Sequence, residues 1–283
     1  MNPLAPTHSD LSQCTEWIQW LPGSLRLIEA HQLAGQQPDN LCGPYWISTL
    51  LKAYEVSHID PARLGQLAGS VLPMGDDPQQ WVPTGASSRQ DYAVPLPTCA
   101  PELGGTSIPG LLAATVQASS AAYTLIPLKT TWTAAHLETL IDLCHTFSHW
   151  QTVPLCNVQT RHFWGSRLNL GRAIAYLQGT PIEPPAPDWS VGHFVTLAGT
   201  VKGAQRSLMI VRDTYPVLGW NGYHLQPFEA IAAALNRNDG SEGGVLLFVA
   251  AHHEPEVKQQ CQQQGWAIAP WDNGTPYRKK GEE

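Results

Sequence analysis

Residues 36–54 constrain the fold more than any other stretch, because they place a cysteine at the start of a helix. Four side chains in this stretch are spaced at i, i+3, i+4 and i+7: Ile47, Leu50, Leu51 and Tyr54. That spacing predicts one apolar face of an α-helix. Pro44 fits the first helical turn, where its missing N–H would have had no partner. Cys42 therefore stands at or just before a helix N-terminus.

This position makes Cys42 a candidate nucleophile. The backbone N–H groups and the dipole at a helix start favour a thiolate over a thiol, and Gly43 lets other backbone approach closely. The alternative is that Cys42 is a small buried hydrophobic residue. A nucleophilic cysteine needs a base and a group that orients the base, and the rest of the chain must supply both.

Length and composition predict a single large domain with a substantial core. The chain has 283 residues, of which 43% are hydrophobic and 14% charged. We expect one α+β domain over residues 1–269, with Pro/Gly-rich insertions near 71–110 and 179–192. Such long loops are either surface insertions without a role or walls of a cleft. Residues 270–283, with a charged end, read as a flexible tail.

The charge pattern argues against several classes of partner. A formal net charge of -7 disfavours binding to nucleic acid or to an anionic membrane surface. No run approaches the ~18 apolar residues of a membrane span, and the N-terminus lacks the layout of a secretion signal. The six cysteines are scattered without paired spacing, which favours reduced thiols. These features predict a cytoplasmic location.

The hydrophobic periodicity predicts helices and strands in a mixed order. A helical pattern over 11–33 is interrupted at Pro22 and Gly23, with Ser24 as the expected cap of its second part. Further helices are expected over 60–68, 111–120, 133–144, 168–177 and 227–235. Strands are expected over 123–128, 153–158, 193–199, 207–213 and 243–250.

Three distant residues complete a set with Cys42 that suits acyl transfer. His193 opens a predicted strand, and Asp213 ends the next one, which is its expected hairpin partner. Cys42 would attack a carbonyl carbon, while His193 would hold the thiolate and then protonate the leaving group. Asp213 would orient the imidazole. Gln36 would offer its amide to the oxyanion, and its neighbour Gln37 is an alternative donor.

Each member of this set also has a structural reading. His193 would fit a hydrogen-bonded core histidine on a strand, and Asp213 would fit the opening of a turn. Trp189, four residues before His193, is the tryptophan that we expect near the cleft.

The motifs Gln-x5-Cys-Gly-Pro, Gly-His-Phe-Val-Thr-Leu and a strand ending in Asp, in this order, resemble the papain-like cysteine peptidase superfamily. The nearest resemblance is to its bacteriocin-processing (double-glycine leader) peptidase branch. It covers three windows, about 36–54, 192–199 and 208–216. It implies a Cys-bearing helix packed on an antiparallel sheet that carries the His and the Asp.

In that family the roles fall on Gln36 as oxyanion donor, Cys42 as nucleophile, His193 as base and Asp213 as orienting acid. Leu41 departs from the pattern, because an acidic residue often precedes the cysteine in leader peptidases.

The predicted function is a thiol-dependent hydrolase, a cysteine peptidase or amidase acting on a peptide or protein. An acyltransferase of the same fold is one alternative, since an acyl-enzyme does not dictate its acceptor. A catalytically silent binding or regulatory module is another. We expect no cofactor.

A patch rich in thiols and imidazoles suggests a metal site only weakly. It comprises Cys144, His145, His149, Cys156 and His162. His145 and His149 would share a helix face at i, i+4, but the spacing matches no common zinc site, so we expect no metal. His252, His253 and Glu254 read as a solvated strand end.

Overall fold

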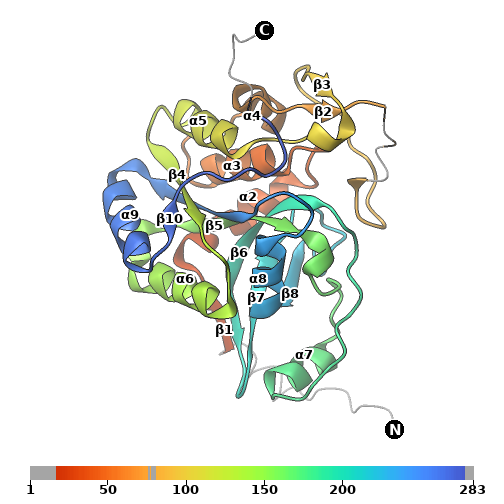
Figure 1. Cartoon of the computed structure of the whole chain (residues 1–283), viewed down its shortest axis with the longest axis vertical. Coiled ribbons are helices and arrows are strands. Elements are labelled where there is room, and N and C mark those ends of the chain that lie inside the picture. Colours follow the sequence, from red (N-terminus) through yellow and green to blue (C-terminus); the bar gives the residue numbers. More distant parts are fainter. Residues whose placement is uncertain (1–16, 76, 78–80, 278–283) are drawn as a thin grey trace.

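An eight-stranded antiparallel sheet forms the centre of the molecule (Figure 1). The computed structural model describes residues 17–75, 77 and 81–277. The strands lie in the order β10-β4-β9-β5-β6-β7-β8, and β1 pairs with β6 as well. Their bounds are β1 Ile18–Trp20, β4 Tyr123–Lys129, β5 Val153–Gln159, β6 Gly192–Lys202, β7 Ser207–Arg212, β8 Tyr223–Pro227, β9 Gly244–Ala250 and β10 Ala267–Ile268.

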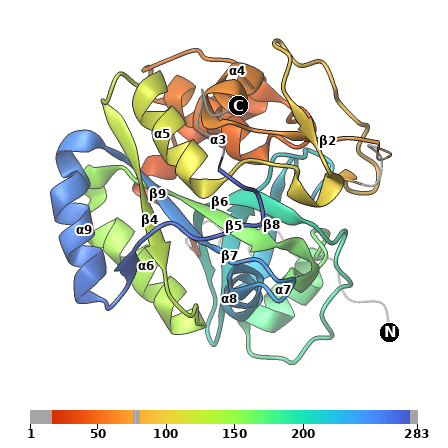
Figure 2. The same ribbon diagram turned by 45° about the horizontal axis from the view of Figure 1, so that its top comes forward.

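Helices cover both faces of this sheet, which gives three layers (Figure 2). One face carries α2 Leu27–Ala34, α3 Cys42–Ala53, α4 Pro61–Ala68 and α5 Ile108–Ala118. The other carries α6 Ala134–Thr146, α8 Phe228–Asn236 and α9 Glu254–Gln263, while α7 Leu170–Leu177 packs on the strand end near Leu208. The short 3-10 turns are η1 Pro22–Ser24, η3 Pro101–Leu103, η4 Ser148–Trp150, η5 Thr160–His162 and η6 Ala251–His253. None of the described helices is long and apolar enough to cross a bilayer.

Strand β9 shows why the layers form. Val245, Leu247 and Val249 belong to the core beneath α6, α8 and α9. Leu246 and Phe248 belong to the core beneath α2 to α5. Successive side chains of a strand point to opposite faces, so a continuous apolar run can be buried only between two helical layers. The predicted α+β mix is confirmed.

Most predicted elements are present, but the N-terminal helix is not as expected. Residues 18–20 form β1, which pairs with β6 through Ile18 and Val201, while residues 11–16 lie outside the described part. Ser24 lies in η1 and caps no helix; α2 begins at Leu27 without a side-chain cap. Pairing with the long strand β6 overrides the local helical pattern.

The predicted tail from residue 270 is wrong for residues 270–277. Trp271 is only 3% exposed, and its indole Nε1 donates to Asn157 Oδ1 at 3.2 Å. Burial of a large aromatic side chain offsets the entropy of ordering this segment. Residues 278–283 lie outside the described residues. Helix α9 was not predicted either, because its exposed face is polar and only Val257 and Cys261 are buried.

The insertion at 71–110 packs against the loop that precedes Cys42. It contains a short parallel pair, β2 Leu72–Pro73 and β3 Thr98–Cys99. The Asp39 carboxylate accepts hydrogen bonds from Ser88 Oγ at 2.5 Å and from the Arg89 backbone N–H at 3.0 Å. The backbone N–H of Asp39 in turn donates to the Arg89 carbonyl at 2.8 Å. The insertion therefore fixes the position of the loop that leads into helix α3.

Candidate active site

Helix α3 brings Cys42 to the start of strand β6. Cys42 is the first residue of α3, and the following residues, 43–51, are buried. The Trp46 indole donates a hydrogen bond to the Phe194 carbonyl at 2.9 Å, which ties the first turn of α3 to β6 one residue after His193. Gly43 lies against Phe194 and Leu111 side chains, so the helix approaches the sheet closely there. The predicted helix start at Cys42 is confirmed.

The hairpin of β6 and β7 brings His193 and Asp213 together. Thr196 of β6 pairs with Arg212 of β7, so the residue after β7 lies beside the start of β6. His193 Nε2 lies 3.2 Å from Asp213 Oδ1, and the two side chains are 2% and 1% exposed. Since Nε2 is turned to Asp213, Nδ1 is the ring nitrogen that is left for Cys42.

The three side chains interact electrostatically. Burial acts to lower the pKa of His193, but the charge and hydrogen bond of Asp213, followed by those of Cys42, outweigh it and raise this pKa to about 10. His193 is therefore protonated at neutral pH. Cys42 is half-buried, so the thiol is reachable while the imidazole and carboxylate are not.

Asp213 has more partners than the sequence indicated. Its Oδ1 accepts the Tyr215 backbone N–H at 3.1 Å, and its Oδ2 lies 3.8 Å from His224 Nε2. Burial alone would raise the pKa of this carboxyl, but His193 and His224 hold it well below its usual range. His224 comes from β8, a strand that the sequence did not predict, so no local signal pointed to it.

A second histidine supports Asp213 through the backbone. His31 Nε2 lies 2.8 Å from the Asp213 carbonyl oxygen, and its ring stacks on Trp46 at 5.1 Å between centroids. Burial and then the nearby Arg212 lower the pKa of His31 to about 4, so it is neutral at pH 7. His31 stands four residues after Leu27, so both lie on the buried face of α2. This spacing is the one sequence signal of its burial.

The two predicted oxyanion donors lie in different surroundings. Gln36 donates its side-chain amide to the Ser87 carbonyl at 2.6 Å. Gln37 is buried, and its amide reaches the Tyr215 hydroxyl at 3.2 Å. Burial, then the charges of Asp39 and Cys42, raise the pKa of that tyrosine, which places it within electrostatic reach of the thiol. The oxyanion role stays a prediction for Gln36, with Gln37 as its alternative.

Trp189, which we expected near the cleft, packs against the imidazole of His193. Its ring centroid is 5.0 Å from that of His193 and 5.2 Å from that of Tyr215, both in edge-on contact. This packing shields the His193–Asp213 pair from water, which strengthens their interaction.

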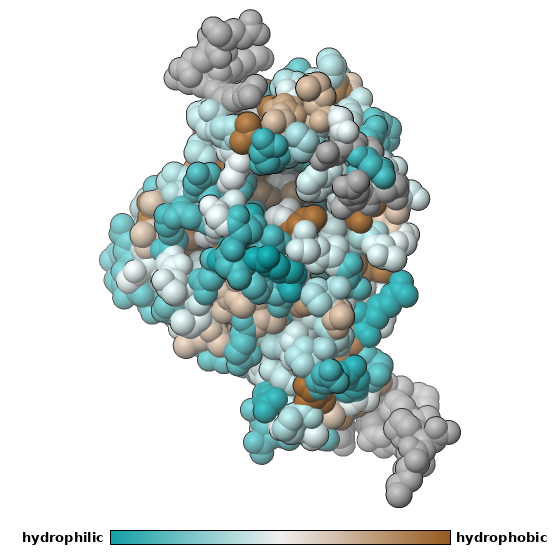
Figure 3. All heavy atoms as spheres, turned by 45° about the vertical axis from the view of Figure 1, so that its right-hand side comes forward, coloured by the Kyte–Doolittle hydropathy of each residue, from teal (hydrophilic) through white to brown (hydrophobic). Residues whose placement is uncertain are grey.

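A pocket of about 300 Å³ opens beside Cys42. Its walls come from the 71–110 insertion, the loop after α8 and residues 273–275, and strands β5 and β6 also contribute to its lining. The lining includes Trp81, Thr106, Asn157, Arg237 and Asn273. Figure 3 shows a recess in the upper half of the molecule, with hydrophilic residues along its lower margin. The insertion thus supplies a wall of the cleft, one of the two readings of the sequence.

One wall of the pocket is fixed by a chain of polar contacts. Arg237 pairs with Asp239 at 2.6 Å and also reaches Asn157 Oδ1 at 3.4 Å. Asn157 Oδ1 in turn accepts the Trp271 indole N–H. The sequence analysis assigned none of the four to the site, because the loop after α8, strand β5 and the segment after β10 meet only in the folded chain.

The thiol and imidazole patch does not form a single site. Cys144 and Cys156 are buried in the core, and burial raises the pKa of each thiol far above its ordinary value. Helix α6 ends at Thr146, so His149 does not share a helix face with His145; that expectation is wrong. His162 instead lies beside Asn238, at 3.1 Å.

Comparison with known protein families shows to which family the chain belongs. A family of unknown function, DUF6885, matches residues 21–272. The chain belongs to DUF6885. The match covers Cys42, His193 and Asp213 and all strands of the sheet except β1, while pocket residues 273–275 lie just beyond it. No curated protein matches the chain.

Proposed function

We propose that this chain is a thiol-dependent hydrolase that cleaves a peptide or amide bond through an acyl-enzyme. The observation that carries the proposal is the buried His193–Asp213 pair in electrostatic contact with the half-buried Cys42. A histidine with a purely structural role has no requirement for both a thiol at a helix start and a carboxylate as neighbours, whereas a catalytic histidine has.

The reaction follows from these positions. The Cys42 sulfur attacks the substrate carbonyl carbon, and the protonated His193 donates its proton to the leaving nitrogen as the C–N bond breaks. A thioester then joins the acyl group to Cys42. Water attacks the thioester, His193 accepts a proton from it, and the sulfur leaves as a thiolate, which restores the ion pair. Asp213 keeps the imidazole oriented throughout.

The backbone N–H groups at the start of α3 are the natural oxyanion donors, joined by a glutamine side chain. Removing one such donor costs roughly 3 kcal/mol in comparable sites. We further propose that the fold is papain-like, since a helix that starts with the nucleophile packs on an antiparallel sheet that carries the base and the acid. Acyl transfer remains a variant, because the acceptor is set by what enters the pocket.

The test is selective alkylation of Cys42. Wild-type protein is treated with iodoacetamide over a range of pH, and peptide mapping by mass spectrometry assigns the label to each cysteine. We expect Cys42 to be labelled faster than the four buried cysteines, because its half-buried sulfur lies beside a protonated imidazole. The His193→Gln variant should lose this fast labelling, while the exposed His58→Gln variant should keep it.

A second step separates enzyme from binding module. Wild-type and Cys42→Ser proteins are incubated with a library of peptides, and cleavage is followed by mass spectrometry. Cleavage by the wild type alone supports the hydrolase. Ordinary reactivity of Cys42 that does not respond to His193→Gln would overturn it and favour the silent module.

A further inference from the structure

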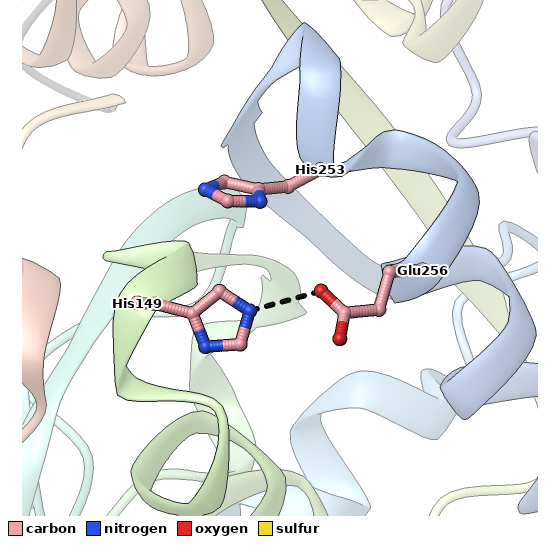
Figure 4. A group of neighbouring side chains, drawn as sticks. All are labelled: His149, His253 and Glu256. Atoms are coloured by element: carbon pink, nitrogen blue, oxygen red, sulfur yellow. Dashed lines mark hydrogen bonds and ion pairs between the residues drawn. The ribbon is translucent and has the colours of Figure 1, made fainter.

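A second cluster of metal-ligating side chains lies outside the Cys42 cleft. His149 comes from η4, His253 from η6, and Glu256 from the first turn of α9 (Figure 4). One ligand atom of each lies within 4.8 Å of the others. His149 Nε2 and Glu256 Oε2 are 2.9 Å apart, and the two imidazole centroids are 5.2 Å apart. None of the three lines the pocket beside Cys42.

The cluster is held in place by buried neighbours. The indole of Trp150, which is 2% exposed, donates to Glu256 Oε2 at 2.7 Å. Trp150 in turn stacks on Phe147 at 4.4 Å, with the rings nearly parallel. A hydrogen bond to a ligating carboxylate is the kind of supporting contact that orients metal ligands. The Glu256 carboxylate is therefore held by a hydrogen bond from a buried side chain.

The chemistry of the side chains also suits a metal, because the cluster brings two imidazoles and one carboxylate together. Neutral imidazole and ionised carboxylate are the forms that bind metal ions.

We propose that His149, His253 and Glu256 form a binding site for a divalent transition metal, zinc above all. Two imidazole nitrogens and one carboxylate oxygen are a typical zinc set, and water would complete four-coordination. The donors disfavour magnesium and calcium, which prefer oxygen alone. A bound ion would take the place of the His149–Glu256 hydrogen bond and would fasten η4 to the start of α9, two segments 107 residues apart.

Zinc binding is tested in a Cys42→Ala background, because a cysteine and histidine pair can also hold zinc. Binding of Zn²⁺ is measured at neutral pH by competition with a chromophoric chelator, and thermal unfolding is followed with and without the ion. We expect one equivalent of zinc and a higher melting temperature in its presence. His149→Ala and His253→Ala should each weaken binding at least tenfold and remove the thermal shift.

Matched controls decide the outcome. His58→Ala removes an exposed histidine elsewhere and should leave zinc binding unchanged. Excess Mg²⁺ should not displace the ion. Thermal unfolding in the presence of a chelator shows whether each variant is folded. Glu256→Gln keeps a hydrogen-bond acceptor for Trp150 and tests the carboxylate ligand. Zinc affinity that is unchanged in both His149→Ala and His253→Ala would overturn the proposal, as would the absence of binding by the parent protein. Neither result would bear on the proposed hydrolase.

Discussion

The buried histidine behind the candidate site should make the stability of this protein depend on pH in a specific way. His31 is 4% exposed, its Nε2 faces the Asp213 carbonyl, and its Nδ1 is buried without a hydrogen-bond partner among the described residues. Protonation would place a charge on that unpartnered nitrogen. Its pKa falls from 6.5 to about 4 on folding, first because of burial and then because of Arg212.

The sign and size follow from linkage. A group whose pKa is lowered on folding stabilises the folded state above its unfolded pKa, and this stability is lost as pH falls towards the folded pKa. For His31 that window runs from about 6.5 down to about 4. Between about pH 8 and about pH 5, its contribution to the free energy of unfolding should fall by about 2 kcal/mol.

His193 acts in the opposite direction, because its pKa is raised on folding to about 10. Its contribution is complete below about pH 6.5 and is lost as pH rises through about 10. The wild-type curve is therefore a sum of opposing trends. The difference between the wild type and His31→Gln isolates His31, since glutamine retains an N–H donor but does not titrate.

The assay is urea unfolding at about pH 8 and about pH 5. From the higher to the lower pH, His31→Gln should lose about 2 kcal/mol less stability than the wild type. His58→Gln, at an exposed position, should follow the wild type. Parallel curves for the wild type and His31→Gln would refute the reasoning, since they would mean that His31 titrates alike in the folded and unfolded states.

Three further predictions concern single side chains. Trp271→Ala should destabilise the fold by about 3–5 kcal/mol in urea unfolding, because it removes a buried indole and its hydrogen bond; a loss below 1 kcal/mol would show a dispensable segment. Gly199→Ala should lower the melting temperature, because the new Cβ would lie 2.3 Å from a backbone oxygen of β1, whereas Gly171→Ala, with room in α7, should stabilise by about 0.5–1 kcal/mol. His224→Gln should raise the pKa of Asp213, since His224 is one of the two histidines that lower it, so the variant should unfold at a higher pH on acidification; an unchanged acid-unfolding midpoint would contradict the contact.

Local spacing in the sequence was enough to predict the elements that carry the candidate site. The apolar face of 47–54 and the proline in the first turn placed Cys42 at the start of α3, and the apolar run after His193 predicted β6. Each of these signals depends on residues within two turns or one strand of one another, which is the range over which periodicity carries information.

The long-range pairings were decided by the folded chain. His224 reaches Asp213 because β8 pairs with β7, Trp271 closes the cleft wall because a core accepts it, and His149 meets Glu256 because η4 lies beside α9. None of these contacts leaves a local pattern, since each joins segments whose separation in the chain says nothing about their distance in space. Sheet order and side-chain burial set those distances, and both are properties of the complete fold.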